Sequence, residues 1–495
     1  MKRTQSILLL SLLIFVTQLP ASTSIAATPK TGAKCSKMKQ VQVVNGLRYT
    51  CIKSAGGLVW SKGVTFRTAT STPTPTSICE IPPTSVKISK PKIASLPKRV
   101  KSPYRVAIVP LLFKDTASDA IAKFPTGLDI QRQILDKDSF VQSWLTDQSF
   151  GSFVLVGKVF DAVSINQNFL YPNGETFKND KDPIDIKISE SYQGYDLLMF
   201  VPMNDKRLGG ANSFTTAYKC NFRINGNLVP ATQQMLWMPI RIGSDEFGNS
   251  QNSFLDQEET YTRATEKEFE EKTRKTSYTY FQSTFLHELI HTLGYGAHAN
   301  SRTADGKVYT ESLPSSEKIE KEYGNLFDVM GSGEYMLGLS SYIKYVLGWS
   351  DRFGNVAFGE TKTFTLSHNE SKQGLIGIRM VNSDYQEALS PDEKLIFWGG
   401  GYWIEVLPKN SKYSSRLDFV EANSEGIVIH QTEAISAWLL DASPNPIRKY
   451  NWGTAPDTSD VVLREGQSFN DGTISITNVK VQSTGQVTFT VSKQK

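Results

Sequence analysis

Hydrophobic and polar positions change their spacing along the chain, and each change marks a different region. Between residues 104 and 203, "YRVAIVPLLFKD" and "YDLLMFVPM" are apolar runs of strand length. The intervening "SFVQSWLTDQSFG" has the pattern of a helix. Strands interleaved with helices are typical of a mixed sheet that helices cover. We therefore predict an α/β or α+β domain over residues 104–356.

The segment between residues 279 and 294 carries the clearest helical pattern. Apolar side chains recur every four residues, and two more widen the same face: Phe281, Phe285, Leu286, Leu289, Ile290 and Leu293. This spacing predicts a largely buried helix. The helix is expected to end at Gly294, because glycine readily adopts the conformation that terminates helices.

After Gly354 the apolar runs become short and are separated by Gly, Asn, Asp and Pro. In the last two runs apolar and polar residues alternate, with apolar side chains at Ile474, Ile476, Val487, Phe489 and Val491. Many short strands at regular spacing are typical of a β-sandwich. We predict an all-β sandwich domain over residues 357–495.

Two further regions precede residue 104. Residues 28–66 contain short β-prone runs separated by Asn-Gly and Gly-Gly, which indicates hairpins. So small a β module needs a covalent staple, and Cys35 and Cys51 flank it. Residues 67–103 are rich in Thr, Pro, Ser and Lys, and we interpret them as a linker.

The first 27 residues differ from the rest of the chain. Two early positive charges, the apolar run "ILLLSLLIFV" and small residues before position 28 follow the order of a secretory signal peptide. The run is short for a membrane span, which needs about 20 apolar residues. We therefore predict an extracellular protein, with cell-wall association open and no stable membrane span.

Charge adds little to this picture. The formal net charge is +5, and it falls to +3 without Lys2 and Arg3. This mild excess, with no concentrated run of Lys or Arg, gives nucleic-acid binding little support.

Residues 28–66 resemble small two-cysteine modules near the N-termini of exported actinobacterial proteins. An inert spacer and a weak cell-wall contact both fit such a module.

The stretch "HELIHTLGYGAH" (287–298) carries the candidate chemistry. Residues four apart lie on one helix face, so His287 and His291 can aim both imidazoles at one cation. Glu288 lies about 100° around the helix, where it suits a general base acting on water held by Zn²⁺. Two solvated helix histidines beside a salt-bridging glutamate are the alternative.

A catalytic zinc site needs a third protein ligand. His298 is the histidine available just past the turn expected at Gly294. If His298 is instead an exposed loop residue, Asp305 and Glu311 are the carboxylate candidates. His368 and His430 fall in the predicted sandwich, and a structural role is the expectation for both. The sequence does not indicate whether calcium is also bound.

At these residues the chain resembles metzincin metalloproteases, in particular gametolysin-like and immune-inhibitor-A-like peptidases. The likeness covers roughly residues 104–495, and it implies an α+β fold for the domain of residues 104–356. It includes H-E-x-x-H-x-x-G and the later turn "YGNLFDVMGSG" (323–333). The resemblance implies that Met330 forms an apolar floor under the metal. The third histidine departs from the family pattern, because it comes one residue later than usual.

The resemblance implies a secreted zinc endopeptidase in which Glu288 activates a zinc-bound water. An exported binding or adhesion protein with a vestigial zinc site is the rival, and hydrolysis of a non-peptide amide is a third option. Four cysteines in an exported chain predict two disulfides. After Cys35–Cys51, a Cys79–Cys220 bridge is preferred. The alternative is a free Cys79 thiolate that occupies the zinc and silences the enzyme.

Overall fold

The computed structural model describes much of the chain, in two compact units that divide between Glu80 and Ile81. The described residues are 30–65 and 99–493, except for 39–40, 45–46, 55, 63, 122–123, 170–183, 205–211, 214–221, 231–232, 242–279, 305–306, 311–312, 333–335, 358, 382–387, 390–395, 415–423, 435 and 443–460. The expected signal peptide, most of the linker, Cys79, Cys220, Asp305 and Glu311 lie outside them.

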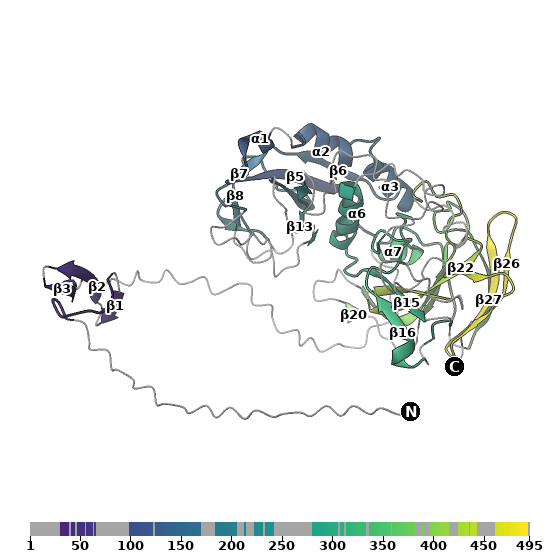
Figure 1. Ribbon diagram of the computed structural model, residues 1–495. Coiled ribbons are helices and arrows are strands. Elements are labelled where there is room, and N and C mark those ends of the chain that lie inside the picture. The colour runs from purple at the N-terminus through teal and green to yellow at the C-terminus, as the bar shows by residue number, and fades with distance from the viewer. Residues whose placement is uncertain are drawn as a thin grey trace, which may run out of the picture. The chain divides into compact units, whose positions relative to one another are not determined.

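The first unit is a small antiparallel sheet, as predicted (Figure 1). Its strands are β1 (Val41–Val44), β2 (Leu47–Ser54), β3 (Gly57–Trp60) and β4 (Val64–Thr65). Cys35 and Cys51 form the predicted disulfide. Cys51 pairs across the sheet with Trp60, and both side chains are buried. Among the side chains of this unit that the structure describes, Cys51 and Trp60 are the buried ones.

The second unit begins with a mostly parallel sheet in the order β10-β13-β9-β5-β6, with β14 beside β9 and β7 beside β5. Its strands are β5 (Tyr104–Phe113), β6 (Leu155–Val159), β7 (Val163–Ile165), β9 (Leu197–Asn204), β10 (Asn212–Ser213), β13 (Gln234–Trp237) and β14 (Ile240–Arg241). From Val106 to Phe113 the strand β5 is an unbroken apolar run, because both of its faces are covered there.

Helices cover one face of this sheet, and a small sheet covers the other. Val106 and Ile108 pack with α2 (Gly127–Ile134), α3 (Phe140–Gln148) and α6 (Tyr280–Thr292). Ala107 and Val109 point the opposite way, toward the three-stranded sheet. That sheet comprises β8 (Ile184–Ile186), β11 (Phe222–Ile224) and β12 (Asn227–Leu228). The short helix α1 (Ser118–Ile121) follows β5.

Two further sheets enclose a third core. The larger has the order β16-β15-β23-β22-β21-β19-β17, with β20 beside β21 and β24 beside β22. The smaller has the order β18-β27-β26-β25. The strands are β15 (Ala299–Ala304), β16 (Lys318–Lys321), β17 (Phe353–Asn355), β18 (Thr361–Leu366), β19 (Gly377–Val381), β20 (Ala388–Leu389), β21 (Ile396–Glu405), β22 (Gly426–Ala434), β23 (Ser436–Leu440), β24 (Leu463–Arg464), β25 (Phe469–Asn470), β26 (Ile474–Val481) and β27 (Val487–Lys493).

The alternation in the last two strands is confirmed. All five of the predicted inward residues are buried in the core between these sheets: Ile474, Ile476, Val487, Phe489 and Val491. The protein is thus an α+β, sheet-rich fold with few helices among the described residues. No helix in the described part of the chain combines the length and apolar character needed to cross a membrane.

The larger sheet contains strands from both sides of the expected boundary at 356/357. β15 pairs in parallel with β23, and Ala299 lies opposite Ala437. β16 and β17 belong to the same sheet. The backbone directly after His298 therefore belongs to the sheet that forms one wall of the β-rich region, not to a sheet of residues 104–356 alone.

Candidate metal site

The helix α6 carries His287 and His291 and ends in a defined cap. Its face of Phe285, Leu286, Leu289 and Ile290 is fully buried. At its end the Gly294 amide donates to the His291 carbonyl at 3.1 Å, and the Tyr295 amide donates to the Ile290 carbonyl at 3.3 Å. These two bonds form a Schellman motif, with Gly294 at φ 115°. The predicted stop at Gly294 is confirmed.

The loop after this cap accommodates the extra residue that places His298 one position later than the third histidine of the metzincin pattern. Of Gly294 and Gly296, only Gly294 has a positive φ. Tyr295 and Ala297 turn their side chains into the core. The Ala299 amide then donates to the Met330 carbonyl at 2.8 Å, which fixes the chain directly after His298. The positive φ of Gly294 and the buried side chains of Tyr295 and Ala297 are therefore enough to turn the chain back toward α6.

The three histidines predicted as ligands lie together. His287, His291 and His298 each place one ring nitrogen within 4.8 Å of the other two. The ring centroids of the two helix histidines are 4.9 Å apart, and that of His298 lies 5.5 Å and 5.2 Å from them. Zinc–imidazole bonds of about 2.0–2.1 Å require nitrogens about 3.4 Å apart, which small side-chain rotations provide. The three residues can hold one metal ion.

Each of the three imidazoles has an oxygen acceptor at Nδ1. Nδ1 of His287 lies 2.7 Å from the Val329 carbonyl, and Nδ1 of His291 lies 2.8 Å from the Tyr295 carbonyl. Nδ1 of His298 lies 2.7 Å from Oε1 of Glu322. These oxygens can only accept, so each Nδ1 carries a proton, and Nε2 is the nitrogen that offers a lone pair when the ring is neutral. Such partners fix the tautomer and ring orientation of histidine ligands.

Burial also keeps the two helix histidines neutral. It lowers the pKa of His287 to about 3, and the neighbouring His291 and His298 add to the effect. Burial, with His298, lowers the pKa of His291 to about 4. Neutral imidazole is the form that binds metals, so no proton has to leave either ring at neutral pH. The donor set, tautomers and charge state fit a divalent metal that prefers nitrogen ligands.

Glu288 and Tyr323 border the same space. The Glu288 side chain is buried, with 8% of the residue exposed. The Tyr323 hydroxyl donates to Nε2 of His298 at 2.7 Å, and the two rings stack at 3.8 Å. Burial raises the pKa of Tyr323, and the charges of Glu322 and Glu288 raise it further. The Glu288 charge therefore acts on the Tyr323 hydroxyl, which contacts Nε2 of His298.

Tyr323 and Glu322 were missed by the sequence interpretation. Tyr323 has φ 58°, a conformation that non-glycine residues rarely adopt. Its amide donates to Oδ1 of Asn300, which holds the turn beside β15. No local pattern encodes this geometry, because the turn is defined by a strand partner 23 residues earlier.

The backbone of the segment that contains Met330 contacts His287 directly and contacts Ala299, the residue after His298. The Val329 carbonyl accepts from His287, and the Met330 carbonyl accepts from Ala299. Met330 is fully buried in the core that also contains Phe285 and Leu289. The role of Met330 as an apolar floor under a metal stays a prediction.

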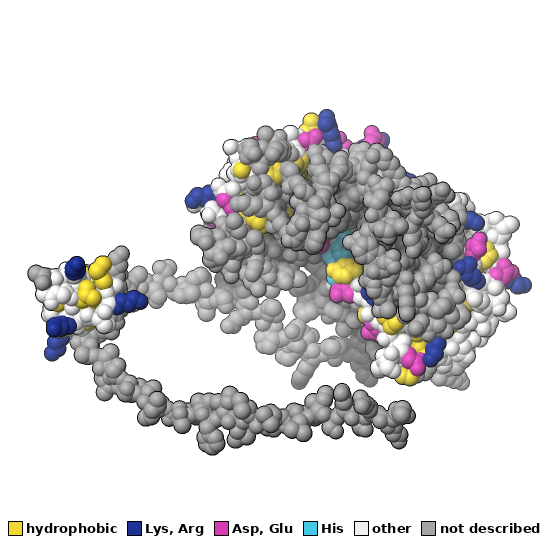
Figure 2. Space-filling model, in the orientation of Figure 1, with side chains coloured by type: hydrophobic (Ala, Val, Ile, Leu, Met, Phe, Trp, Pro, Cys, Tyr) yellow, Lys and Arg dark blue, Asp and Glu magenta, His cyan; other side chains and the backbone are white. Residues whose placement is uncertain are grey.

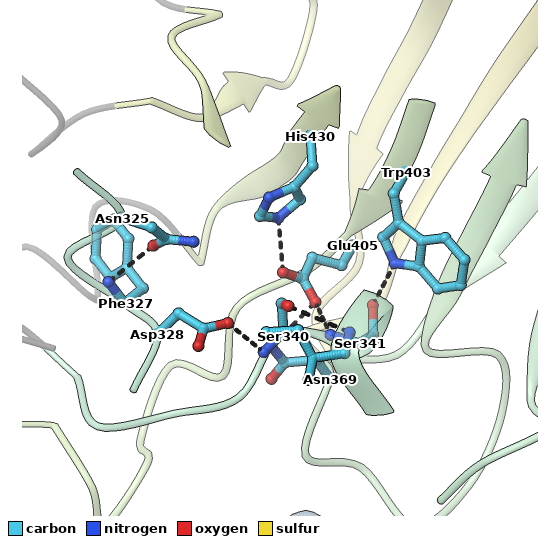
Figure 3. A network of polar contacts seen from close by, with 10 residues as sticks. Asn325, Phe327, Asp328, Ser340, Ser341, Asn369, Trp403, Glu405 and His430 are labelled. Atoms are coloured by element: carbon cyan, nitrogen blue, oxygen red, sulfur yellow. Dashed lines mark hydrogen bonds and ion pairs between the residues drawn. The ribbon is translucent and has the colours of Figure 1, made fainter. Parts of the chain in front are cut away.

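A buried polar network holds this segment against the larger β-rich sheet (Figure 3). Asp328 accepts from the amides of Met330 and Ser340, both at 2.8 Å. Ser341, next in the chain, starts α7 (Ser341–Val346) and donates its amide to Glu405 at 2.7 Å. Glu405 is paired at 2.8 Å with His430, and both are buried. His430 therefore has a structural contact, while His368 lies outside the histidine cluster.

Comparisons with known proteins identify no family for this chain. No protein-family model matches it, and no curated protein sequence matches it. The resemblance to metzincins therefore rests on the motif residues and their arrangement, not on a family match.

Proposed function

We propose that the protein is an exported zinc-dependent endopeptidase. The observation that carries the proposal is the convergence of three histidines, each with Nδ1 engaged by an oxygen, beside a buried glutamate. His287, His291 and His298 would hold the ion. The Cys35–Cys51 disulfide supports an oxidising compartment, where such bonds persist.

When bound in such a site, zinc acts as a Lewis acid that polarises a carbonyl and lowers the pKa of water to about 7. Glu288 takes a proton from the attacking water as the oxygen adds to the peptide carbonyl carbon. It then delivers that proton to the amine nitrogen as the C–N bond breaks. The enclosed position of Glu288 suits this role, because the carboxylate stays close to the site and away from bulk cations.

Casein cleavage by the purified protein tests the proposal. Activity is expected with one equivalent of zinc, is lost with a chelator and returns when zinc is restored. Glu288→Gln should retain the zinc and lose about 10²–10⁴-fold in rate, the usual contribution of a general base. His287→Ala should lose both zinc and activity.

The outcomes separate the proposal from its rivals. Equal cleavage after verified zinc removal would contradict it. Zinc binding without hydrolysis of casein or of a broad peptide library would favour the binding-protein alternative. Hydrolysis of small acyl amides alone would assign the same site to a non-peptide substrate.

A further inference from the structure

The small net charge of the chain is the sum of two parts of opposite sign. Residues 28–103 contain 14 Lys and Arg but one acidic residue, Glu80, for a formal net charge of +13. Residues 104–495 contain 38 basic and 48 acidic residues, for a net charge of −10. Such asymmetry within a chain is typical of a basic part that binds polyanions.

In the first compact unit, every charged side chain that the structure describes is basic and exposed. These side chains are Lys30, Lys34, Lys37, Lys53 and Lys62. Residues 28–66 contain no Asp or Glu, so no carboxylate of this module can neutralise them. A stable sheet that keeps this many uncompensated lysines in solvent carries a strong positive potential.

Both faces of the sheet are open to solvent. Ile52 and Lys53 are consecutive residues of β2, so their side chains point to opposite faces of the sheet, and both are exposed. Figure 2 shows dark-blue side chains at separate places around the unit, with other surface between them. A flat membrane would meet one side of so small a module. A flexible linear polymer can reach several sides at once.

We infer that the module of residues 30–65 binds linear polymers that carry repeated phosphate groups. Lysine is a compact, mobile point charge, which suits phosphates presented without a fixed geometry. Each contact releases a counterion, so the affinity depends steeply on salt. The binding is independent of the metal site and would hold the remainder of the chain near surfaces or particles rich in such polymers.

Binding of the full chain to fluorescently labelled linear polyphosphate tests the inference across a salt series. The wild type should bind at low salt, with pyrophosphate a poor competitor because it lacks repeated charges. Substitution of Lys34, Lys37, Lys53 and Lys62 by Gln should reduce the slope of log affinity against log salt by roughly 3, or about 0.7 per lysine. Affinity at low salt should fall by roughly tenfold or more.

A matched variant changes the same number of exposed lysines in the second unit: Lys114, Lys137, Lys372 and Lys480 to Gln. It should bind polyphosphate about as well as the wild type, because these lysines lie outside the module. Disulfide mapping of Cys35–Cys51 checks that the module variant has folded. Absence of polyphosphate binding in the wild type, equal losses in the two variants, or binding to vesicles with anionic lipid but not to polyphosphate would each overturn the inference.

Discussion

Glu322 accepts a hydrogen bond from Nδ1 of His298 at 2.7 Å, although 67% of the Glu322 side chain is exposed. The other two histidines of the cluster have buried backbone carbonyls in the equivalent position. His298, the histidine with the unusual spacing, is therefore also the one whose orientation depends on a solvent-exposed side chain.

Replacing Glu322 by Gln should weaken zinc binding about 10–100-fold, the usual effect of losing such a partner. The ring would keep an acceptor but lose the charge that makes it a stronger ligand. Competition against a chelator of known affinity measures the change. Glu317→Gln, which removes another exposed carboxylate from the same segment, should leave the affinity unchanged. Equal affinities for wild type and Glu322→Gln would show that the pair does not orient the ligand.

Tyr323→Phe should have the opposite effect on zinc affinity. The Tyr323 hydroxyl hydrogen-bonds to Nε2 of His298, so a zinc ion bound at Nε2 would have to displace that hydrogen bond. A bond worth about 0.5–1.5 kcal/mol corresponds to roughly a 2–10-fold gain in affinity when it is removed. The same chelator competition measures it. A weaker affinity in Tyr323→Phe would mean instead that the hydroxyl helps to hold the ion.

Gly331→Ala should destabilise the protein and release the metal. A Cβ at this position would lie 2.0 Å from the Asn325 carbonyl oxygen and 3.0 Å from that of Ala299. Backbone cannot move aside cheaply, so we expect a cost of about 3 kcal/mol or more in the free energy of unfolding. Urea denaturation measures this. Gly127→Ala, where the nearest atom is 3.4 Å away at the start of α2, should be neutral or slightly stabilising.

Asp328 should make the stability fall as the pH rises from about 4 to about 6. Burial raises its pKa from the ordinary 3.8 to about 6, so the folded state holds a proton that the unfolded state has already lost. The contribution of Asp328 to the free energy of unfolding is therefore largest below pH 4, and it is lost as the pH rises through about 6. In Asp328→Asn this fall should be absent. Denaturation of both proteins across this range should therefore show their stability difference shrinking with pH, and a constant difference would refute the assignment.

A chain that ends at residue 356 should fail to bind zinc. It lacks β23, the partner of β15, and also Glu405, which anchors the start of α7. Zinc binding and cooperative unfolding measured on the truncated chain check this. A chain that begins at residue 99 lacks the first compact unit and should keep both properties. Zinc binding by the chain that ends at 356 would mean that residues 104–356 suffice.

The features that could be predicted from the sequence are those that depend on the spacing of residues within a single helix, strand or loop. The apolar face of α6, its stop at Gly294 and the alternation in the last two strands all depend on residues within one element. The Cys35–Cys51 pair followed from the small size of its module. The approach of His298 to the helix histidines followed from a glycine turn and a short loop.

The pairing of β15 with β23 could not be predicted in the same way. Ala299 of β15 and Ala437 of β23 are far apart in the sequence, and nothing in the sequence of either strand identifies the strand with which it pairs. The contacts of Tyr323 and Glu322 depend on a positive φ at a tyrosine. The opposing charges of residues 28–103 and 104–495 were present in the sequence, but the whole-chain total cancels them.

The use of backbone carbonyls on two of the ligands has an evolutionary consequence. Every residue has a carbonyl, so single substitutions at positions 329 and 295 do not remove the acceptors of His287 and His291. Position 322 is different, because one codon change there removes or restores the acceptor of His298. Variation among descendants of this chain, or in a mutant library, can adjust metal retention at a single surface position without disturbing the packed helix.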